Sequence, residues 1–159
     1  MNPAYYDASY LLKLQIVESG TIAVRAHAST VREIHSAHHG RAEFASAAFR
    51  KVREGVASPA DFRRLMTQFR ADCLSGIILL LPLTDTILDR VESVFATAPV
   101  TAYLRAADAL HLATAAEHGF AEIYSNDTHL LAAAPRFGLR GVNVIPQANP
   151  GGPPAVRSI

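Results

Sequence analysis

The stretch AYLRAADALHLATAAEHGFAEIYSND, residues 102–127, joins a long helix pattern to a short strand pattern that ends in an acid. Residues 102–118 are mostly apolar with helical spacing, and Gly119 is a residue that commonly ends a helix. Residues 121–125 then form a strand pattern that leads to Asp127. A helix that returns the chain to a new strand is the unit from which parallel sheets are built.

The same alternation of strand and helix patterns extends over the rest of the chain. Residues 4–6 indicate a buried strand, Asp7 follows it, and residues 9–17 have helical spacing. The other expected helices span residues 21–29, 41–53, 59–74, 84–98 and 128–134, and the other expected strands span residues 33–36, 77–83 and 142–145. The alternation predicts a three-layer α/β/α fold with a central, mostly parallel sheet.

Length and composition favour a single domain. The chain has 159 residues, half of them hydrophobic, which is enough for one core. We expect this domain to span residues 1–146, followed by a tail at residues 147–159 that is rich in proline and glycine. Cys73 is the only cysteine, which excludes an internal disulfide or a thiolate zinc cluster and fits a reducing cytoplasm.

The apolar runs are too short for a membrane protein. The longest uninterrupted one, residues 77–81, is far below the roughly 20 residues that span a bilayer. Asp7 also interrupts any signal-peptide pattern at the N-terminus. We therefore expect a cytoplasmic protein with no membrane partner.

The positive charges are almost all arginines. The formal net charge is +1, and Lys13 and Lys51 are the only lysines. Guanidinium groups suit forked contacts with phosphate. Candidate phosphate contacts, by proximity in sequence to the acids, are Arg41, Arg50, Lys51, Arg53 and Arg105. The alternative for each is a solvated face or a pairing with an acid.

Four acids stand where an unpaired carboxylate is costly: Asp7, Glu43, Asp108 and Asp127. Asp7 and Asp127 follow strands, and strand ends in a parallel sheet can open into one crevice. Asp108 interrupts an otherwise apolar helix, so either Arg105 or a bound cation must compensate its charge. Together the four acids predict a shared divalent metal ion.

Each acid also has a structural interpretation. Asp7 and Asp127 could simply cap the helices that follow them, although Ser9 could take the first of these roles. Glu43 lies near a helix start, where the helix dipole favours an acid. These alternatives remain open for each residue considered alone.

The histidines near these acids give no clear zinc pattern. His38 and His39 are adjacent, so they point in different directions and lack a convincing second ligand pair. We expect them to lie in a solvated turn. His111, three residues after Asp108, either lines the same cleft or fills the core.

Several segments together resemble the PIN-domain ribonucleases, particularly the VapC-type toxins. They are YDAS at residues 6–9, the helix-borne Glu43, RAADALHLA at residues 105–113 and SND at residues 125–127. The ending FGLRGV, residues 137–142, is similar to the last loop and strand of that family. The resemblance covers residues 3–146.

The resemblance implies a fold, an activity and partners. It implies a PIN-like fold and an endoribonuclease dependent on Mg²⁺ or Mn²⁺, the toxin of a toxin-antitoxin pair. Such a protein forms a homodimer and is inhibited by a cognate antitoxin. The implied catalytic and metal-binding residues are Asp7, Glu43, Asp108 and Asp127, and Ser9 and Ser125 are their implied hydroxyl supports.

Two other functions compete with this one. An acid after the first strand is also found in phosphatases, but Asp7-Ala8-Ser9 lacks the second aspartate of the haloacid-dehalogenase-type pattern. No suitably placed lysine supports phosphoaspartate chemistry. The second alternative is a catalytically silent binding module in which the acids only tie helices together through arginines.

Overall fold

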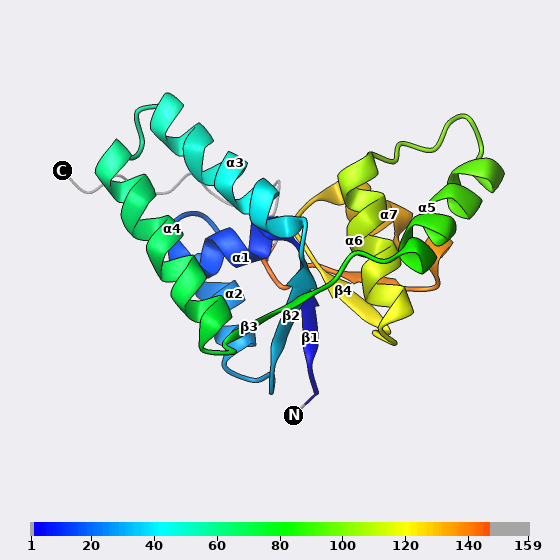
Figure 1. Ribbon diagram of the computed structural model, residues 1–159, viewed down its shortest axis with the longest axis horizontal. Coiled ribbons are helices and arrows are strands. Elements are labelled where there is room, and N and C mark those ends of the chain that lie inside the picture. Colours follow the sequence, from blue (N-terminus) through cyan, green and yellow to red (C-terminus); the bar gives the residue numbers. More distant parts are fainter. Residues whose placement is uncertain (1, 147–159) are drawn as a thin grey trace, which may run out of the picture.

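The computed structural model describes residues 2–146, and a parallel sheet lies at the centre of the described chain. Its strands are β1 (Ala4–Tyr6), β2 (Ile34–Ala37), β3 (Ile78–Leu81), β4 (Glu122–Tyr124) and β5 (Arg140–Val142). They are arranged in the order β3-β2-β1-β4-β5, and every pairing between neighbours is parallel (Figure 1). The predicted mostly parallel sheet is therefore confirmed.

Helices cover both faces of this sheet. They are α1 (Ala8–Gln15), α2 (Thr21–Ala28), α3 (Gly40–Arg53), α4 (Pro59–Leu74), α5 (Asp85–Thr97), α6 (Ala106–Glu117) and α7 (Thr128–Ala133), with a short 3-10 helix η1 (Ala134–Phe137) after the last of them. Helices α1 to α4 lie on one side and α5 to α7 on the other (Figure 1). This is the predicted three-layer α/β/α arrangement.

Alternation along the central strand divides the core in two. Successive side chains of a strand point to opposite faces. In β1, Tyr5 packs with Leu112 of α6, while Tyr6 packs with Phe44 of α3. All of these side chains are fully buried. The first strand thus anchors both helical layers.

The boundaries of several predicted elements differ from the structure. The predicted strand at residues 142–145 lies two residues earlier, since β5 pairs Arg140 with Glu122. The predicted helix at residues 102–118 begins only at Ala106, because Arg105 has an extended backbone with ψ of 153°. The strand predicted at residues 77–83 is shorter at both ends. The predicted tail at residues 147–159 lies outside the described part of the chain.

Strand ends deliver two of the acids to one edge of the sheet. Asp7 follows β1 directly and is the N-cap residue of α1. Asp127 follows β4 and is the N-cap residue of α7. Since β1 and β4 are parallel neighbours, both carboxylates lie at the same edge.

Among residues 2–146, no helix has the length and apolar character that a bilayer crossing requires.

Contacts with α6 and α4 fix the first turns of helix α3. Gly40 lets it approach α6 closely, since a Cβ there would lie 3.2 Å from Cε1 of His111. One turn on, the ring of Phe44 stacks on Phe69 of α4 with 4.0 Å between the centroids. Phe44 follows Glu43 in sequence, so this packing fixes the turn that carries the acid.

We expect Phe44→Ala to lower the free energy of unfolding by about 3–5 kcal/mol, because it leaves a cavity among fully buried side chains. Phe49 on the same helix is 54% exposed, so Phe49→Ala is a matched control. Its cost should be below about 1 kcal/mol. Urea unfolding followed by circular dichroism measures both, and equal losses would contradict the packing described for α3.

Candidate metal centre

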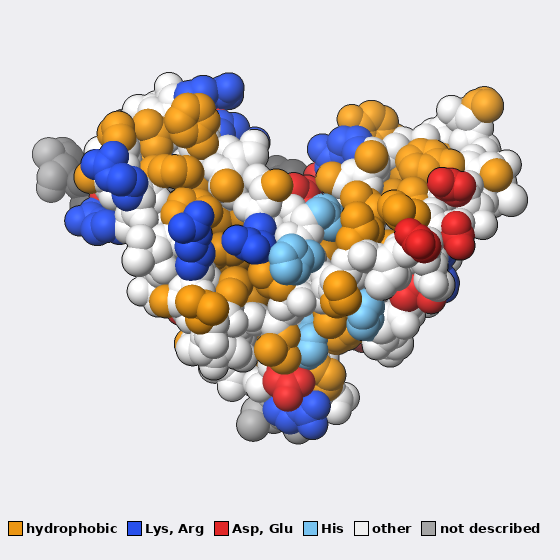
Figure 2. Space-filling view, in the orientation of Figure 1, with side chains coloured by type: hydrophobic (Ala, Val, Ile, Leu, Met, Phe, Trp, Pro, Cys, Tyr) orange, Lys and Arg blue, Asp and Glu red, His pale blue; other side chains and the backbone are white. Residues whose placement is uncertain are grey.

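A cleft of about 590 Å³ lies between the two helical layers at the carboxyl edge of the sheet. All four predicted acids line it: Asp7, Glu43, Asp108 and Asp127. Figure 2 shows a notch between the two halves of the molecule, with acidic side chains at its bottom. Acids that are up to 120 positions apart in the chain (127 − 7) are thus brought together by the fold.

Asp7 is buried and its carboxylate is surrounded by hydrogen-bond donors. Oδ1 accepts hydrogen bonds from the backbone N–H of Tyr10 at 3.0 Å and from Oγ of Ser9 at 2.7 Å. Oδ2 accepts one from Oγ of Ser125 at 2.6 Å. Burial raises the pKa of Asp7, although the charge of His111 and these hydrogen bonds oppose the rise. The cap and the proposed metal ligand are therefore the same side chain.

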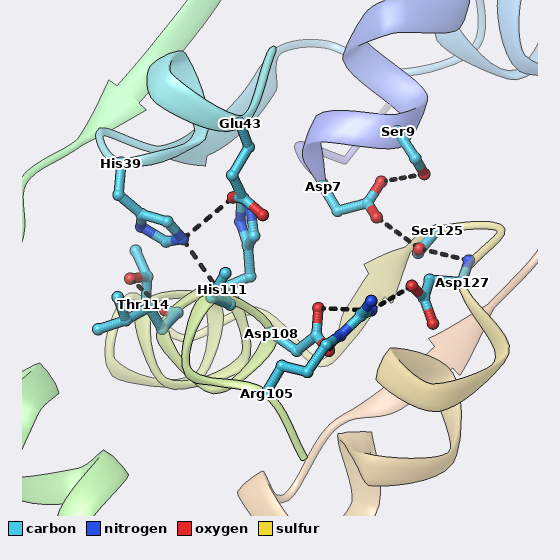
Figure 3. A network of polar contacts seen from close by, with 12 residues as sticks. Asp7, Ser9, His39, Glu43, Arg105, Asp108, His111, Thr114, Ser125 and Asp127 are labelled. Carbon is cyan, nitrogen blue, oxygen red and sulfur yellow. Dashed lines mark hydrogen bonds and ion pairs between the residues drawn. The ribbon is translucent and has the colours of Figure 1, made fainter. Parts of the chain in front are cut away.

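Ser125 ties the ends of β1 and β4 together. Its hydroxyl donates to Asp7 and accepts a hydrogen bond from the backbone N–H of Asp127 at 2.9 Å. It is fully buried. The structure thus places Ser9 and Ser125, the two predicted hydroxyl supports, directly against Asp7 (Figure 3).

Arg105 bridges the carboxylates of Asp108 and Asp127. Its Nε lies 2.7 Å from Oδ2 of Asp108 and its Nη2 lies 3.2 Å from Oδ1. The same Nη2 also pairs with Oδ2 of Asp127. These hydrogen bonds raise the pKa of Arg105. The sequence predicted that either Arg105 or a cation compensates the charge of Asp108, and in the structure Arg105 pairs with it.

Asp127 has its two oxygens in different roles. Oδ1 caps α7 by accepting from the backbone N–H of His129 at 2.8 Å and from that of Leu130 at 3.3 Å. Oδ2 faces Arg105. Partial burial acts to raise the pKa of Asp127, but the hydrogen bonds from Arg105 and from the start of α7 hold it below its ordinary value.

Glu43 is held by two histidines. Nε2 of His111 lies 2.7 Å from Oε2 of Glu43, and Nε2 of His39 lies 3.4 Å from the same oxygen. On its other side, Nδ1 of the fully buried His111 lies 2.9 Å from the hydroxyl of Tyr5. Partial burial acts to raise the pKa of Glu43, but the hydrogen bond from His111 and the neighbouring charges bring it below its ordinary value.

The prediction for the adjacent histidines was right for one and wrong for the other. His38 is exposed and contacts Arg41. His39 turns inward, with its side chain only 17% exposed, because consecutive residues at the start of α3 point in different directions. Burial, and then the charge of His111, lower the pKa of His39 to about 4. The signal in the sequence was the four-residue spacing of His39 and Glu43, which places both on one helix face.

Four of the five predicted basic residues line this cleft: Arg50, Lys51, Arg53 and Arg105. Arg41 lies outside it. Sequence reasoning missed Lys13, which lines the cleft one helical turn after Ser9. Its Nζ lies 2.6 Å from Glu18, which also pairs with Lys51 at 2.7 Å. The last turn of α3 and Lys13 therefore bring cationic side chains to the cleft, with Glu18 paired to both lysines.

The ligand atoms that this cleft offers suit a hard divalent cation. The carboxylates of Asp7, Asp108 and Asp127 line the same cleft and offer only oxygen atoms as ligands (Figure 3), although their oxygens do not form a group within 4.8 Å of one another. Mg²⁺ and Mn²⁺ favour such oxygens. A single guanidinium is the only cationic side chain that pairs with Asp108 and Asp127 in the described structure, so a bound cation would relieve a concentrated negative charge.

The chain matches a known protein family. The model of the PIN domain matches residues 4–135, which include all four acids and both serines. A comparison with curated proteins found no match.

We expect Asp7→Asn to increase stability in the absence of metal at pH 7. The folded-state pKa of Asp7 is raised, so the wild-type protein loses stability as the pH rises from the ordinary aspartate value to the raised one, and the penalty persists above that. Each unit of such a shift corresponds to about 1.4 kcal/mol. The gain of the variant should therefore be present at pH 7 and vanish below the ordinary pKa.

Thermal unfolding with chelator at pH 3.5 and pH 7 tests this expectation. Asp61 is the control, because its side chain is 42% exposed and hydrogen bonds from Ser58 lower its pKa. Asp61→Asn should change stability in the opposite direction. A variant at Asp7 that is less stable than wild type at pH 7 would show that its hydrogen bonds outweigh the cost of burial.

We expect Arg105→Ala to bind Mn²⁺ more tightly, because the guanidinium competes with a metal ion for Asp108 and Asp127. Removing a half-exposed ion pair of about 1 kcal/mol corresponds to roughly fivefold in affinity. Arg53→Ala is the control, since Arg53 lines the same cleft. Calorimetric titration measures both dissociation constants. Weaker Mn²⁺ binding by Arg105→Ala alone would mean that Arg105 organises the acids instead of competing for them.

Proposed function

This chain belongs to the PIN domain family, whose members are generally metal-dependent nucleases, and from that premise we propose that it is an endoribonuclease that uses Mg²⁺ or Mn²⁺. The proposed catalytic and metal-binding residues are Asp7, Glu43, Asp108 and Asp127. The observation that carries the proposal is their convergence on one cleft from four separate elements. Nothing in the packing of the two cores requires four acids to meet there.

A bound divalent ion would supply an activated water and would offset the negative charge of the phosphodiester. The protein's part is to hold the carboxylates in place. Ser9 and Ser125 fix the orientation of Asp7, and His111 fixes that of Glu43. Side chains fixed by hydrogen bonds need little reorganisation during the reaction.

Arg105 has a second role in this proposal. Its side chain is 48% exposed, so it can leave Asp108 and Asp127 when a metal ion replaces it. Its donors would then be free for a phosphate oxygen. The cationic last turn of α3, with Arg50, Lys51 and Arg53, can hold phosphates further along the RNA strand.

The finer identity rests on the resemblance of the YDAS, RAADALHLA and SND segments to VapC-type toxins. We propose that the protein is the toxin of a toxin-antitoxin pair, acts in the cytoplasm, forms a homodimer and is inhibited by a cognate antitoxin. Exposed apolar side chains support partner binding, among them Ile22 at 88%, Leu74 at 90% and Ile77 at 57% exposure. We also propose that residues 1–146 are the whole catalytic domain, so truncation after Gln147 should leave metal binding intact.

One alternative has specific support. The caps formed by Asp7 and Asp127 and the ion pairs of Arg105 account for three acids without a metal. A catalytically silent binding module would be expected to contain such contacts. The absence of saturable Mn²⁺ binding would favour this module over the nuclease.

We expect the purified protein, freed of any partner, to cleave RNA with Mg²⁺ or Mn²⁺ and to stop when a chelator is added. Asp108→Asn should lower the rate about 100-fold or more, since it removes a few kcal/mol of stabilisation from the transition state. Asp89→Asn, at an exposed position of α5, should cleave at the wild-type rate. Gel analysis of a labelled RNA measures the rates.

Circular dichroism must first show that Asp108→Asn is folded. Unchanged cleavage by the folded variant would reject the proposed site.

A further inference from the structure

Three side chains at the edge of the acidic cleft form a ligand set of a different chemical kind. His39 and Glu43 come from the start of α3, and His111 comes from the middle of α6. One ligand atom of each lies within 4.8 Å of the other two. We propose that these residues bind a transition-metal ion of the Zn²⁺ class, at a second site that shares Glu43 with the carboxylate centre.

The spacing of the ligand atoms is close to that of a tetrahedral site. Nitrogen and oxygen ligands lie about 2.0–2.2 Å from Zn²⁺, so they are roughly 3.4 Å from one another. Nε2 of His39 already lies 3.4 Å from Oε2 of Glu43. Nε2 of His111 lies 2.7 Å from that oxygen, so it must move by less than about 1 Å. The ligand atoms of the two histidines lie within 4.8 Å of each other.

A buried hydroxyl fixes the orientation of the His111 ring. Nδ1 lies 2.9 Å from the oxygen of Tyr5, and both side chains are fully buried. When Nδ1 carries the proton and donates it to Tyr5, the lone pair of Nε2 faces Glu43. Metal-binding histidines commonly donate the other ring N–H to a protein oxygen in this manner.

His39 is poorly satisfied by its protein neighbours. Its Nε2 lies 3.3 Å from the carbonyl oxygen of Ala107 and 3.4 Å from Glu43, both long for hydrogen bonds. Its Nδ1 is buried and has no partner in the described structure. A cation between His39, Glu43 and His111 would replace the two weak contacts of Nε2 with a metal bond. The Nδ1 atom would then carry the ring proton.

The site is accessible and its ligands select the ion. Glu43 and His111 both line the cleft, so an ion can enter and keep a position open toward it. Two imidazoles and one carboxylate favour Zn²⁺ or Co²⁺, whereas the oxygens of Asp7, Asp108 and Asp127 favour Mg²⁺. The cleft thus offers two ligand sets of different hardness.

Titration of the full chain with Co²⁺, followed by visible absorption, tests this proposal. We expect one Co²⁺ per chain with the intense band of four- or five-coordinate cobalt, displaced by an equivalent of Zn²⁺. His39→Ala should lower the affinity at least about tenfold, and Tyr5→Phe should lower it by a similar factor through His111. His38→Ala is the matched control, because that histidine is exposed on the same turn, and it should bind as wild type does.

Absence of the band in the wild type, or equal binding by His39→Ala, would overturn the second site. The proposal does not depend on RNA cleavage. Asp108→Asn should retain the cobalt band while it loses Mg²⁺-dependent cleavage. The cobalt band therefore reports on the second site, and RNA cleavage reports on the nuclease proposal.

Discussion

The concentration of negative charge at one edge of the sheet is the constraint on which the rest of this structure depends. Carboxylates that are buried or half buried in a shared cleft repel one another and lose the solvation of water. Different groups stabilise them: one backbone N–H and two serine hydroxyls for Asp7, Arg105 for Asp108, and a histidine for Glu43. Such an arrangement is costly to stability, and the binding of a cation is the explanation that we propose.

The parallel sheet makes this convergence possible. Because β1 and β4 are neighbours, the residues after them start α1 and α7 at the same edge of the sheet. The caps of those helices are the acids themselves, so the structural and chemical interpretations of Asp7 and Asp127 are compatible. Helices α3 and α6 then approach the same edge from opposite layers, and the close contact of Gly40 with His111 joins them.

Sequence alone predicted the parts of the site that depend on local patterns. Asp7 and Asp127 were found because each follows a strand pattern, and Asp108 because it interrupts an apolar helix. Arg105 was one of two alternatives, since sequence does not show whether an arginine three residues away turns toward the acid. The inward turn of His39 was missed, because its direction depends on contacts with α6, a helix distant in sequence. The predicted position of β5 was wrong by two residues, because the start of this strand depends on its pairing with β4.

The most direct test of a shared metal ion is a crystal structure of the protein soaked in Mn²⁺, with anomalous scattering recorded at the manganese edge. The account predicts a peak within coordination distance of carboxylate oxygens from Asp7, Asp108 and Asp127, with Arg105 moved away from the acids. A map without a peak in the cleft, with Arg105 still paired to Asp108 and Asp127, would contradict it.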